Sequence, residues 1–310
     1  MIPGPVQPAG PERAPNMRPH PVTTTKLSES ELDDIRTLIE QRSAILFDAS
    51  RERFFSTRIR EYIEEKELAG GAELYEQVKS SSTEYEALLE RLLTQETSFF
   101  RYPAVYDALE KRILPEMQER KFWQNPRTLR IWSAGCSTGE EAYSIAITLC
   151  DALKFVEAWE IEILATDISR RALRHAERGL YSKRSLQDVS LGQVDAHFAN
   201  TKHGFQIKPR IRKMISFAQM NLVEPVYVGK LDCIFCMNVL MYFSEERRLA
   251  ILRRFYDALE PGGYFLLGHS ETLSNVPMKF ESLVIGDCRI YRKPVAAEPR
   301  AASVLLEESL

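Results

Sequence analysis

One thirteen-residue segment, Leu129–Glu141, constrains the fold of this chain more than any other part of the sequence. Its apolar run stops at Gly135 and Gly139, and an amphipathic helical pattern begins directly after the second glycine. This order is typical of a strand, a tight turn and a helix N-terminus, where glycines admit a ligand close to the backbone and the first helical turn offers free N–H groups. The segment therefore predicts a nucleotide or nucleoside site. The alternative is a structural turn whose glycines only relieve backbone strain.

The spacing of these glycines narrows the class of ligand. They follow the pattern G-x-x-x-G, which differs from the G-x-G-x-x-G of dinucleotide-binding folds. Two carboxylates, Glu140 and Glu141, lie directly after the turn and would repel a pyrophosphate placed there. We therefore expect a cationic cofactor that carries no phosphate.

Composition limits the other possibilities. The chain has 310 residues, of which 44% are hydrophobic, enough to bury a full core and to form about two domains. A formal net charge of -3 gives no basic field, so we expect no nucleic-acid partner. No apolar run reaches the roughly 18 residues that span a bilayer, and the proline-rich N-terminus lacks the apolar stretch of a signal peptide. We expect a monomeric, cytoplasmic protein with no membrane insertion.

The cysteines do not indicate a disulfide framework or a metal site. There are five of them, an odd number spread through apolar segments. Cys233 and Cys236 form a C-x-x-C pair inside a strand-like run, where side chains three positions apart point to opposite faces. We therefore predict buried free thiols and no metal ligands.

Periodicity divides the chain into segments. Residues 1–26 are rich in proline and are expected to be disordered, and residues 294–310 are expected to form a flexible tail. Residues 27–95 have helical periodicity and predict a small helical domain, whose first helix Ser28 or Ser30 can cap. Residues 96–293 predict a second domain, interrupted at about 180–215 by a small hairpin-bearing insertion.

The second domain alternates between strand-like and helical patterns. Strands are predicted at Leu129–Ala134, Ile161–Thr166, Ile215–Met220, Leu231–Met237 and Tyr264–Gly268, and helices at Glu140–Leu153, Arg170–Arg178 and Glu245–Leu259. The last helix is expected to end at Pro261-Gly262-Gly263, and Phe280–Lys293 adds one or two strands as an antiparallel edge. This alternation predicts an α/β fold with a doubly wound, mainly parallel sheet and helices on both faces.

Polar residues follow four of the predicted strands. They are Gly135, Asp167, Asn221 and Asn238. Ligands of doubly wound sheets lie beyond the carboxyl ends of the strands, so these residues are expected to surround one site. Asp167 stands where a carboxylate commonly accepts hydrogen bonds from the hydroxyls of a ribose. It could instead cap the helix that begins at Ser169.

The segment Leu93–Tyr102 precedes this domain and carries a further candidate. Phe99 and Phe100 are expected to anchor the segment in the core. Arg101 would then be held near the top of the sheet, where a guanidinium can pair with a carboxylate of cofactor or substrate. An ordinary salt bridge is the alternative.

Together these motifs resemble the chemotaxis receptor glutamate O-methyltransferases, the CheR family. The matching residues are Thr97–Arg101, Trp132–Ser144, Ala165–Asp167, Asn221-Leu222, Cys236–Phe243 and Gly268–Glu271, in the family's order, and the resemblance covers about residues 27–293. It implies a Rossmann-like methyltransferase fold and S-adenosylmethionine as cofactor. It also implies the formation of glutamyl methyl esters on the cytoplasmic helices of chemoreceptors, with S-adenosylhomocysteine as product.

The resemblance also implies roles for individual residues. Cofactor binding falls to Gln95, Thr97, Arg101, Ala134, Gly135, Glu141, Asp167, Asn221, Leu222, Met237 and Asn238. Glu141 would engage the methionine end and Asp167 the ribose, with Glu140 as a second candidate for the former role. Arg101 and Tyr242 match the two polar side chains nearest the transferred methyl group and are the catalytic candidates.

The chain departs from the family pattern at three places. Gln95 stands where the family often has Asn, and Met237 stands where it often has Arg, which changes contacts near the cofactor. The insertion is shorter between Phe198 and Gly204 than in enteric members, whose glycine-rich loop docks a pentapeptide at the receptor's C-terminus. We therefore expect a chemoreceptor partner that is recognised without pentapeptide tethering.

Substrate recognition is predicted on the helical domain. Arg51, Arg53, Arg58 and Arg60 lie on the segment that meets the acidic receptor surface in the family. A solvated helix face is the alternative. Two other functions remain open for the whole chain: a methyltransferase acting on another protein or a small molecule, and a noncatalytic scaffold that senses the cofactor or its product.

Overall fold

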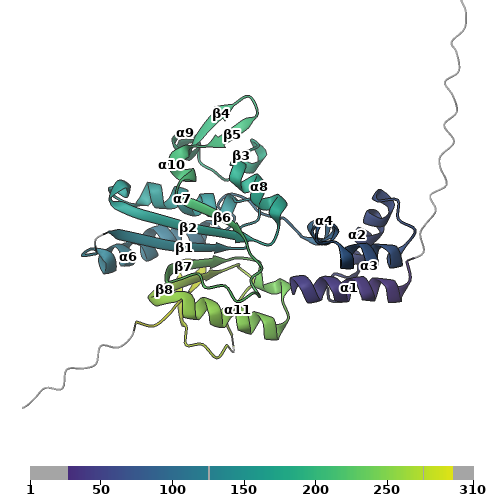
Figure 1. Ribbon diagram of the computed structural model, residues 1–310. Helices are drawn as coiled ribbons and strands as arrows, with labels where there is room; N and C mark the ends of the chain where they lie inside the picture. Colours follow the sequence, from purple (N-terminus) through teal and green to yellow (C-terminus); the bar gives the residue numbers. More distant parts are fainter. Residues whose placement is uncertain (1–26, 125, 275, 296–310) are drawn as a thin grey trace, which may run out of the picture.

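The computed structural model describes residues 27–124, 126–274 and 276–295. The predicted disordered segment 1–26 and nearly all of the predicted tail 294–310 lie outside these ranges. Within them, a helical region is followed by a seven-stranded sheet flanked by helices (Figure 1). None of the helices in the described ranges is long and apolar enough to cross a membrane.

The helical region consists of α1 (Glu29–Ser43), α2 (Glu52–Glu65), α3 (Gly71–Ser80) and α4 (Ser82–Leu92). Of the two predicted caps, Ser28 is the one used, and it forms a capping box with Glu31. The apolar stripes of the four helices form a hydrophobic cluster of their own, which includes Ile35, Phe55 and Leu88. In Figure 1 these helices lie beyond one end of the sheet.

The sheet has the strand order β6-β2-β1-β7-β8-β10-β9. Its bounds are β1 (Arg127–Ala134), β2 (Trp159–Asp167), β6 (Ile215–Gln219), β7 (Leu231–Cys236), β8 (Leu259–Leu267), β9 (Glu281–Ile285) and β10 (Cys288–Arg292). The first five are parallel, and β10 is antiparallel to both of its neighbours. The strand order therefore reverses between β1 and β7, which is where a doubly wound sheet binds its ligand.

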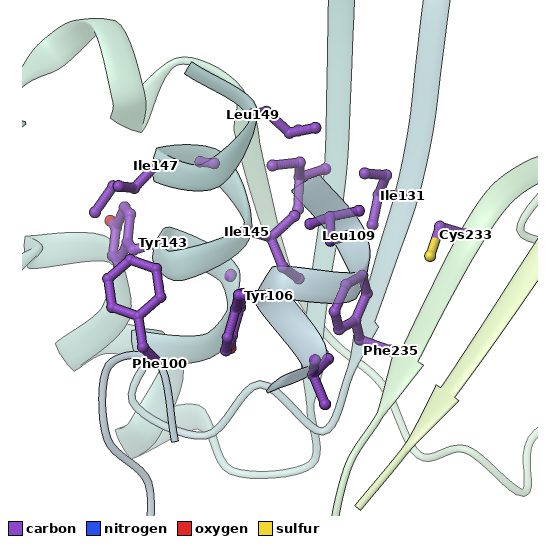
Figure 2. Close-up of a cluster of buried hydrophobic side chains, with 14 of the residues drawn as sticks. Phe100, Tyr106, Leu109, Ile131, Tyr143, Ile145, Ile147, Leu149, Cys233 and Phe235 are labelled. Atoms are coloured by element: carbon purple, nitrogen blue, oxygen red, sulfur yellow. The ribbon is translucent and has the colours of Figure 1, made fainter. Parts of the chain in front are cut away.

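Alternating side chains on the central strands pack on opposite faces of the sheet. Ile131 and Cys233 face α7 (Glu140–Ala152) and the helix before β1, whereas Trp132 and Cys236 face α11 (Glu245–Ala258). Figure 2 shows the first face, with side chains of α7 packed beside Tyr106 and Phe235. The two cysteines of the C-x-x-C pair thus lie on different faces, as predicted, and the five cysteines are free thiols.

A helix that the sequence analysis had not assigned joins the two parts of the chain. It comprises α5 (Pro103–Ala108), a π-helical turn η1 (Leu109–Ile113) and α6 (Leu114–Lys121). Pro103 stands in its first turn, where the missing N–H is tolerated. The helix buries Tyr106, Leu109 and Ile113 against α7 and the sheet.

The predicted insertion is a small three-stranded antiparallel sheet. Its strands are β3 (Leu180–Tyr181), β4 (Phe198–Thr201) and β5 (Gly204–Ile207), and it follows α8 (Arg170–Arg178). Short helices α9 (Leu191–His197) and α10 (Pro209–Arg212) complete it, with short 3-10 turns nearby, and in Figure 1 it projects above the main sheet. The β4–β5 hairpin closes through only two residues, Lys202 and His203.

One predicted boundary was wrong. The predicted helix Glu245–Leu259 agrees with α11, which ends at Ala258, but the strand predicted to begin at Tyr264 begins at Leu259, so Pro261-Gly262-Gly263 lie inside β8 and do not end the helix. They accompany a register irregularity in the pairing of β7 with β8, where Gly262 adopts φ +76. The N–H of Gly262 donates to the carbonyl of Lys293, so the backbone of this irregular turn remains hydrogen-bonded.

Candidate active site

A cavity of about 270 Å³ lies at the carboxyl ends of the central strands. Its walls come from the loops after β1, β2, β6 and β7, from residues 93–101 and from Ile45 of the helical region. Two segments that precede the sheet in sequence therefore cover the point where the strand order reverses. Its lining contains ten of the eleven predicted cofactor residues, all except Ala134: Gln95, Thr97, Arg101, Gly135, Glu141, Asp167, Asn221, Leu222, Met237 and Asn238.

The glycine turn after β1 forms one wall. Gly135 adopts φ +88, and a Cβ atom there would approach Cγ2 of Val239 to 2.4 Å, so no other residue fits without rearrangement. The N–H groups of Gly135 and Cys136 both donate to the carbonyl of Thr166, which ties the turn to the end of β2. Gly139, with φ +96, caps α7. The turn therefore brings the backbone close to the cavity, as the sequence predicted.

Glu141 places a carboxylate in the cavity that has one hydrogen-bonding partner. The side chain is only 8% exposed, and its Oε1 accepts a 2.6 Å hydrogen bond from the hydroxyl of Ser133. Burial raises the pKa of the Glu141 carboxyl to about 7 because the single hydroxyl donor only partly offsets desolvation. A cation bound beside this carboxylate would replace the lost solvation.

Asp167 is fixed by the backbone on both sides. Its Oδ2 accepts the N–H of Ser137 at 2.8 Å, and its Oδ1 accepts the N–H of Ser169 at 2.9 Å. Burial nevertheless raises the pKa of Asp167 above its ordinary value. Each oxygen keeps a further lone pair, so the carboxylate is pre-oriented to accept two hydroxyl groups. The capping of α8 at Ala172 is done by the hydroxyl of Ser169, so Asp167 does not serve as that cap.

The loop after β7 is held by a network around Asn238. This residue has φ 61, a left-handed conformation that asparagine tolerates, and its Oδ1 accepts a hydrogen bond of 2.8 Å from the hydroxyl of Tyr102. The carboxylate of Glu271 accepts the N–H groups of Asn238, Gly268 and Met241 at 2.7, 3.1 and 3.3 Å. The floor of the cavity is therefore rigid.

Residues 95–101, which precede α5, supply further polar groups to the cavity. The Gln95 amide donates to the hydroxyl of Ser169 at 3.1 Å. Arg101 donates to the carbonyl of Glu96 at 2.7 Å and to its carboxylate at 3.1 Å. Phe99 and Phe100 are buried, as predicted, and anchor this segment.

The comparison with known proteins decides the family. Residues 95–286 match the family model described as "CheR methyltransferase, SAM binding domain". The chain belongs to the CheR methyltransferase family. It is 31% identical over 274 residues to chemotaxis protein methyltransferase 2 of Vibrio cholerae, covering 86% of this chain and 94% of that protein. It is 30% identical over 273 residues to chemotaxis protein methyltransferase 1 of Pseudomonas aeruginosa, covering 86% of this chain and 98% of that protein.

A third relative is the chemotaxis protein methyltransferase of Borreliella burgdorferi, 35% identical over 191 residues, which cover 60% of this chain and 67% of that protein. This member of the CheR family is therefore an S-adenosylmethionine-dependent methyltransferase with the Rossmann-like fold that the sequence predicted. The roles of its individual side chains stay predictions, tested below.

The cavity of this methyltransferase suits S-adenosylmethionine in its chemistry. Glu141 offers a buried carboxylate for the ammonium group, and Asp167 offers two oriented lone pairs for the ribose hydroxyls. Among lining side chains in the described ranges, the hydroxyls of Ser137 and Tyr106 are buried with no hydrogen-bonding partner. Leaving a buried hydroxyl without a hydrogen-bonding partner costs free energy, so we expect a polar ligand to supply the missing partners.

Two predicted residues lie outside the lining of the cavity. Ala134 is fully buried at the end of β1 and packs in the core that faces α11, so only its position before the turn can matter. The second candidate for the methionine end, Glu140, accepts a 2.6 Å hydrogen bond from Thr138 and does not line the cavity. In the described ranges, no cluster of three or more His, Cys, Asp or Glu side chains could hold a metal ion.

The four predicted recognition arginines separate into two kinds. Arg51 lies beside the cavity, with its guanidinium 4.9 Å from the ring centroid of Tyr242, which lines the cavity. Arg53 and Arg60 are exposed, and Arg58 is exposed and paired with Glu61 at 2.7 Å. The structure thus places only Arg51 next to the catalytic candidate.

Sequence analysis missed several residues of the site. Glu271 belonged to a matched family motif but had no role assigned. Tyr102 and Ser133 lie next to predicted residues, and only their three-dimensional contacts show that they support Asn238 and Glu141. Tyr106 lies in a helix that had not been predicted, so no pattern indicated it.

Proposed function

We propose that this enzyme methylates glutamate side chains on the cytoplasmic helices of a chemoreceptor, and that it does so in the cytoplasm. The observation that carries the proposal is that Glu141 and Asp167 line one cavity together with Arg101 and Tyr242. Relatives named chemotaxis protein methyltransferase, matched over almost their whole length, support the receptor as substrate.

The chemistry requires little proton transfer. S-adenosylmethionine supplies an electrophilic methyl group on a cationic sulfur. A glutamate has an ordinary pKa of about 4.3, so the acceptor carboxylate is already ionised near neutral pH and needs no general base. Its oxygen forms the new bond to the methyl carbon while the bond from that carbon to sulfur breaks and its electron pair stays on sulfur. The products are the methyl ester and S-adenosylhomocysteine.

The protein's contribution is alignment and desolvation. Arg101 would orient the acceptor carboxylate from the segment before α5, and Tyr242 would do so from the loop after β7. The helical region holds Tyr242 in place, because the carbonyl of Tyr242 accepts the N–H of Leu46 at 2.8 Å and its ring packs against the guanidinium of Arg51. Positioning two reacting groups in this way can contribute several kcal/mol to lowering the barrier.

The receptor is expected to approach over the helical region. Arg53, Arg58 and Arg60 project from α2, on the same element that begins beside Tyr242. Exposed cations there would attract an acidic helix and steer it toward the opening of the cavity. The two-residue turn of the β4–β5 hairpin leaves no loop to dock a tail peptide, which supports recognition without pentapeptide tethering.

The test is transfer of a radiolabelled methyl group from S-adenosylmethionine to a purified receptor cytoplasmic fragment. We expect incorporation that mild alkali releases as methanol, which identifies an ester, and that disappears when the acceptor glutamates are replaced by alanine. Label that resists alkali would indicate another acceptor group. Tight binding of S-adenosylhomocysteine without any transfer would instead identify a noncatalytic sensor.

A further inference from the structure

Tyr106 has a buried hydroxyl group to which the proposed function assigns no role. The residue is 5% exposed, and its ring is clamped in the core beside Phe100, at 5.1 Å between centroids, and Phe235, at 6.5 Å. Figure 2 shows the ring between α7 and Phe235 on β7. Its hydroxyl oxygen is buried and forms no hydrogen bond with another residue in the described ranges, and the residue lines the cavity.

The surroundings of this hydroxyl show which end of the cavity it faces. The carboxylate of Glu141 is close enough to raise the pKa of Tyr106 further, after burial, which is the larger cause. The nearby hydroxyl of Ser144 acts on this pKa weakly in the opposite direction, but its own hydrogen bonds are to the carbonyl of Glu140, to which it donates, and to the N–H of Phe100, which it accepts. Tyr106 is therefore a neutral donor at the Glu141 end of the cavity.

We propose that the Tyr106 hydroxyl donates a hydrogen bond to the α-carboxylate of the cofactor's amino-acid end. This inference depends on the placement of the cofactor under the proposed function. Glu141 is suited to the ammonium group at that end, but as an anion it repels the neighbouring carboxylate, which needs a donor of its own. The guanidinium of Arg101 already donates hydrogen bonds to the carbonyl and the carboxylate of Glu96. The rigid Tyr106 ring supplies a donor that loses no side-chain entropy on binding.

The experiment compares two ligands on two proteins. Wild type and Tyr106→Phe are titrated calorimetrically with S-adenosylhomocysteine and with its decarboxylated analogue, S-adenosyl-3-thiopropylamine, which keeps the amine and lacks the carboxylate. The substitution removes one oxygen atom and keeps the ring packing. We expect Tyr106→Phe to weaken binding of S-adenosylhomocysteine about tenfold, as for a hydrogen bond to a charged group, and to leave binding of the analogue unchanged.

Two controls separate this result from a change in folding. The thermal midpoint of ligand-free Tyr106→Phe should not fall below that of wild type, because the hydroxyl has no well-formed hydrogen bond to a described residue to lose. Tyr264→Phe is a matched control, a buried tyrosine whose hydroxyl bonds Glu116 away from the cavity, and it should leave both affinities unchanged.

Equal weakening of both ligands, or no weakening of either, would overturn the inference. The proposed function is tested separately. Binding of S-adenosylhomocysteine and methyl transfer to the receptor are measured on the wild-type protein, so their outcome does not depend on Tyr106→Phe.

Discussion

The guanidinium of Arg51 lies 4.9 Å from the ring centroid of Tyr242. The first residue precedes α2 in the helical region, and the second lies in the loop after β7, which lines the cavity. A further link is the antiparallel bridge between Ile45 and Phe243. The helical region therefore contacts the catalytic candidate directly, so substrate docking and alignment of the acceptor share one surface.

Tyr242→Phe should lower turnover about tenfold while leaving the affinity for S-adenosylhomocysteine nearly unchanged. The hydroxyl is predicted to orient the acceptor, whereas the ring and backbone keep the contacts with Arg51 and Leu46. Steady-state methylation of the receptor fragment and calorimetric titration measure the two effects. Loss of cofactor affinity in parallel with turnover would refute the role assigned to Tyr242.

Charge reversal at Arg53 and Arg58 should reduce receptor methylation more than tenfold at low ionic strength. The effect should shrink at about 0.5 M salt, where the Debye length falls to a few Å. Arg174→Glu with Arg253→Glu is a matched double reversal on exposed positions of α8 and α11. Equal methylation by the two double variants would show that α2 does not recognise the receptor.

Cofactor binding should depend on pH through Glu141. The pKa of its carboxyl is about 7 in the ligand-free protein, and a bound ammonium group would lower it. Affinity for S-adenosylhomocysteine should therefore be greatest above pH 7 and fall roughly tenfold for each unit below it. Glu141→Gln should bind weakly at every pH, and a wild-type affinity that does not change between pH 5.5 and 8 would contradict this assignment.

The same carboxyl should affect stability in the opposite direction. Its pKa in the fold is raised above the ordinary 4.5, so protonation stabilises the ligand-free protein, and this stabilisation is lost as the pH rises through about 7. Glu141→Gln should thus have a higher thermal midpoint than wild type at pH 8, with a smaller difference at pH 5.5. Differential scanning calorimetry of both proteins without ligand measures this, and a lower midpoint for the variant at pH 8 would be inconsistent with a desolvated carboxylate.

Glu271→Gln should impair both cofactor affinity and turnover, by about threefold to tenfold each. The carboxylate accepts three backbone N–H groups from two segments, and an amide has only one accepting atom to serve them. Glu281→Gln, on the exposed surface of β9, provides the control. Wild-type affinity and turnover in Glu271→Gln would show that the loop after β7 holds its conformation without this anchor.

Sequence patterns predicted the parts of the fold that depend on local periodicity. The strands β1, β2, β6, β7 and β8, the helices α7, α8 and α11, and the residues at the strand ends follow from alternation between apolar periods. Helix α5 was missed because Phe99 and Phe100, which precede it, were interpreted only as anchors of their segment in the core. The position of Pro261 was misread because proline and glycine end helices but also occur in strand irregularities.

Local patterns predicted the candidate site best where one residue follows one strand. Gly135, Asp167 and Asn238 are of this kind. The contacts of Glu271 and Tyr102 with Asn238 join residues 33 and 136 positions apart, and Arg51 reaches Tyr242 across two domains of the sequence. Such contacts depend on how segments distant in the sequence pack together at the end of the sheet, which no local pattern encodes.

The most direct measurement is a crystal structure of the enzyme soaked with S-adenosylhomocysteine. The account predicts that the ribose hydroxyls lie about 3 Å from the Asp167 carboxylate and the amino group about 3 Å from that of Glu141, with the sulfur facing Tyr242. A nucleoside bound elsewhere, or bound in this cavity with its ends reversed, would contradict it.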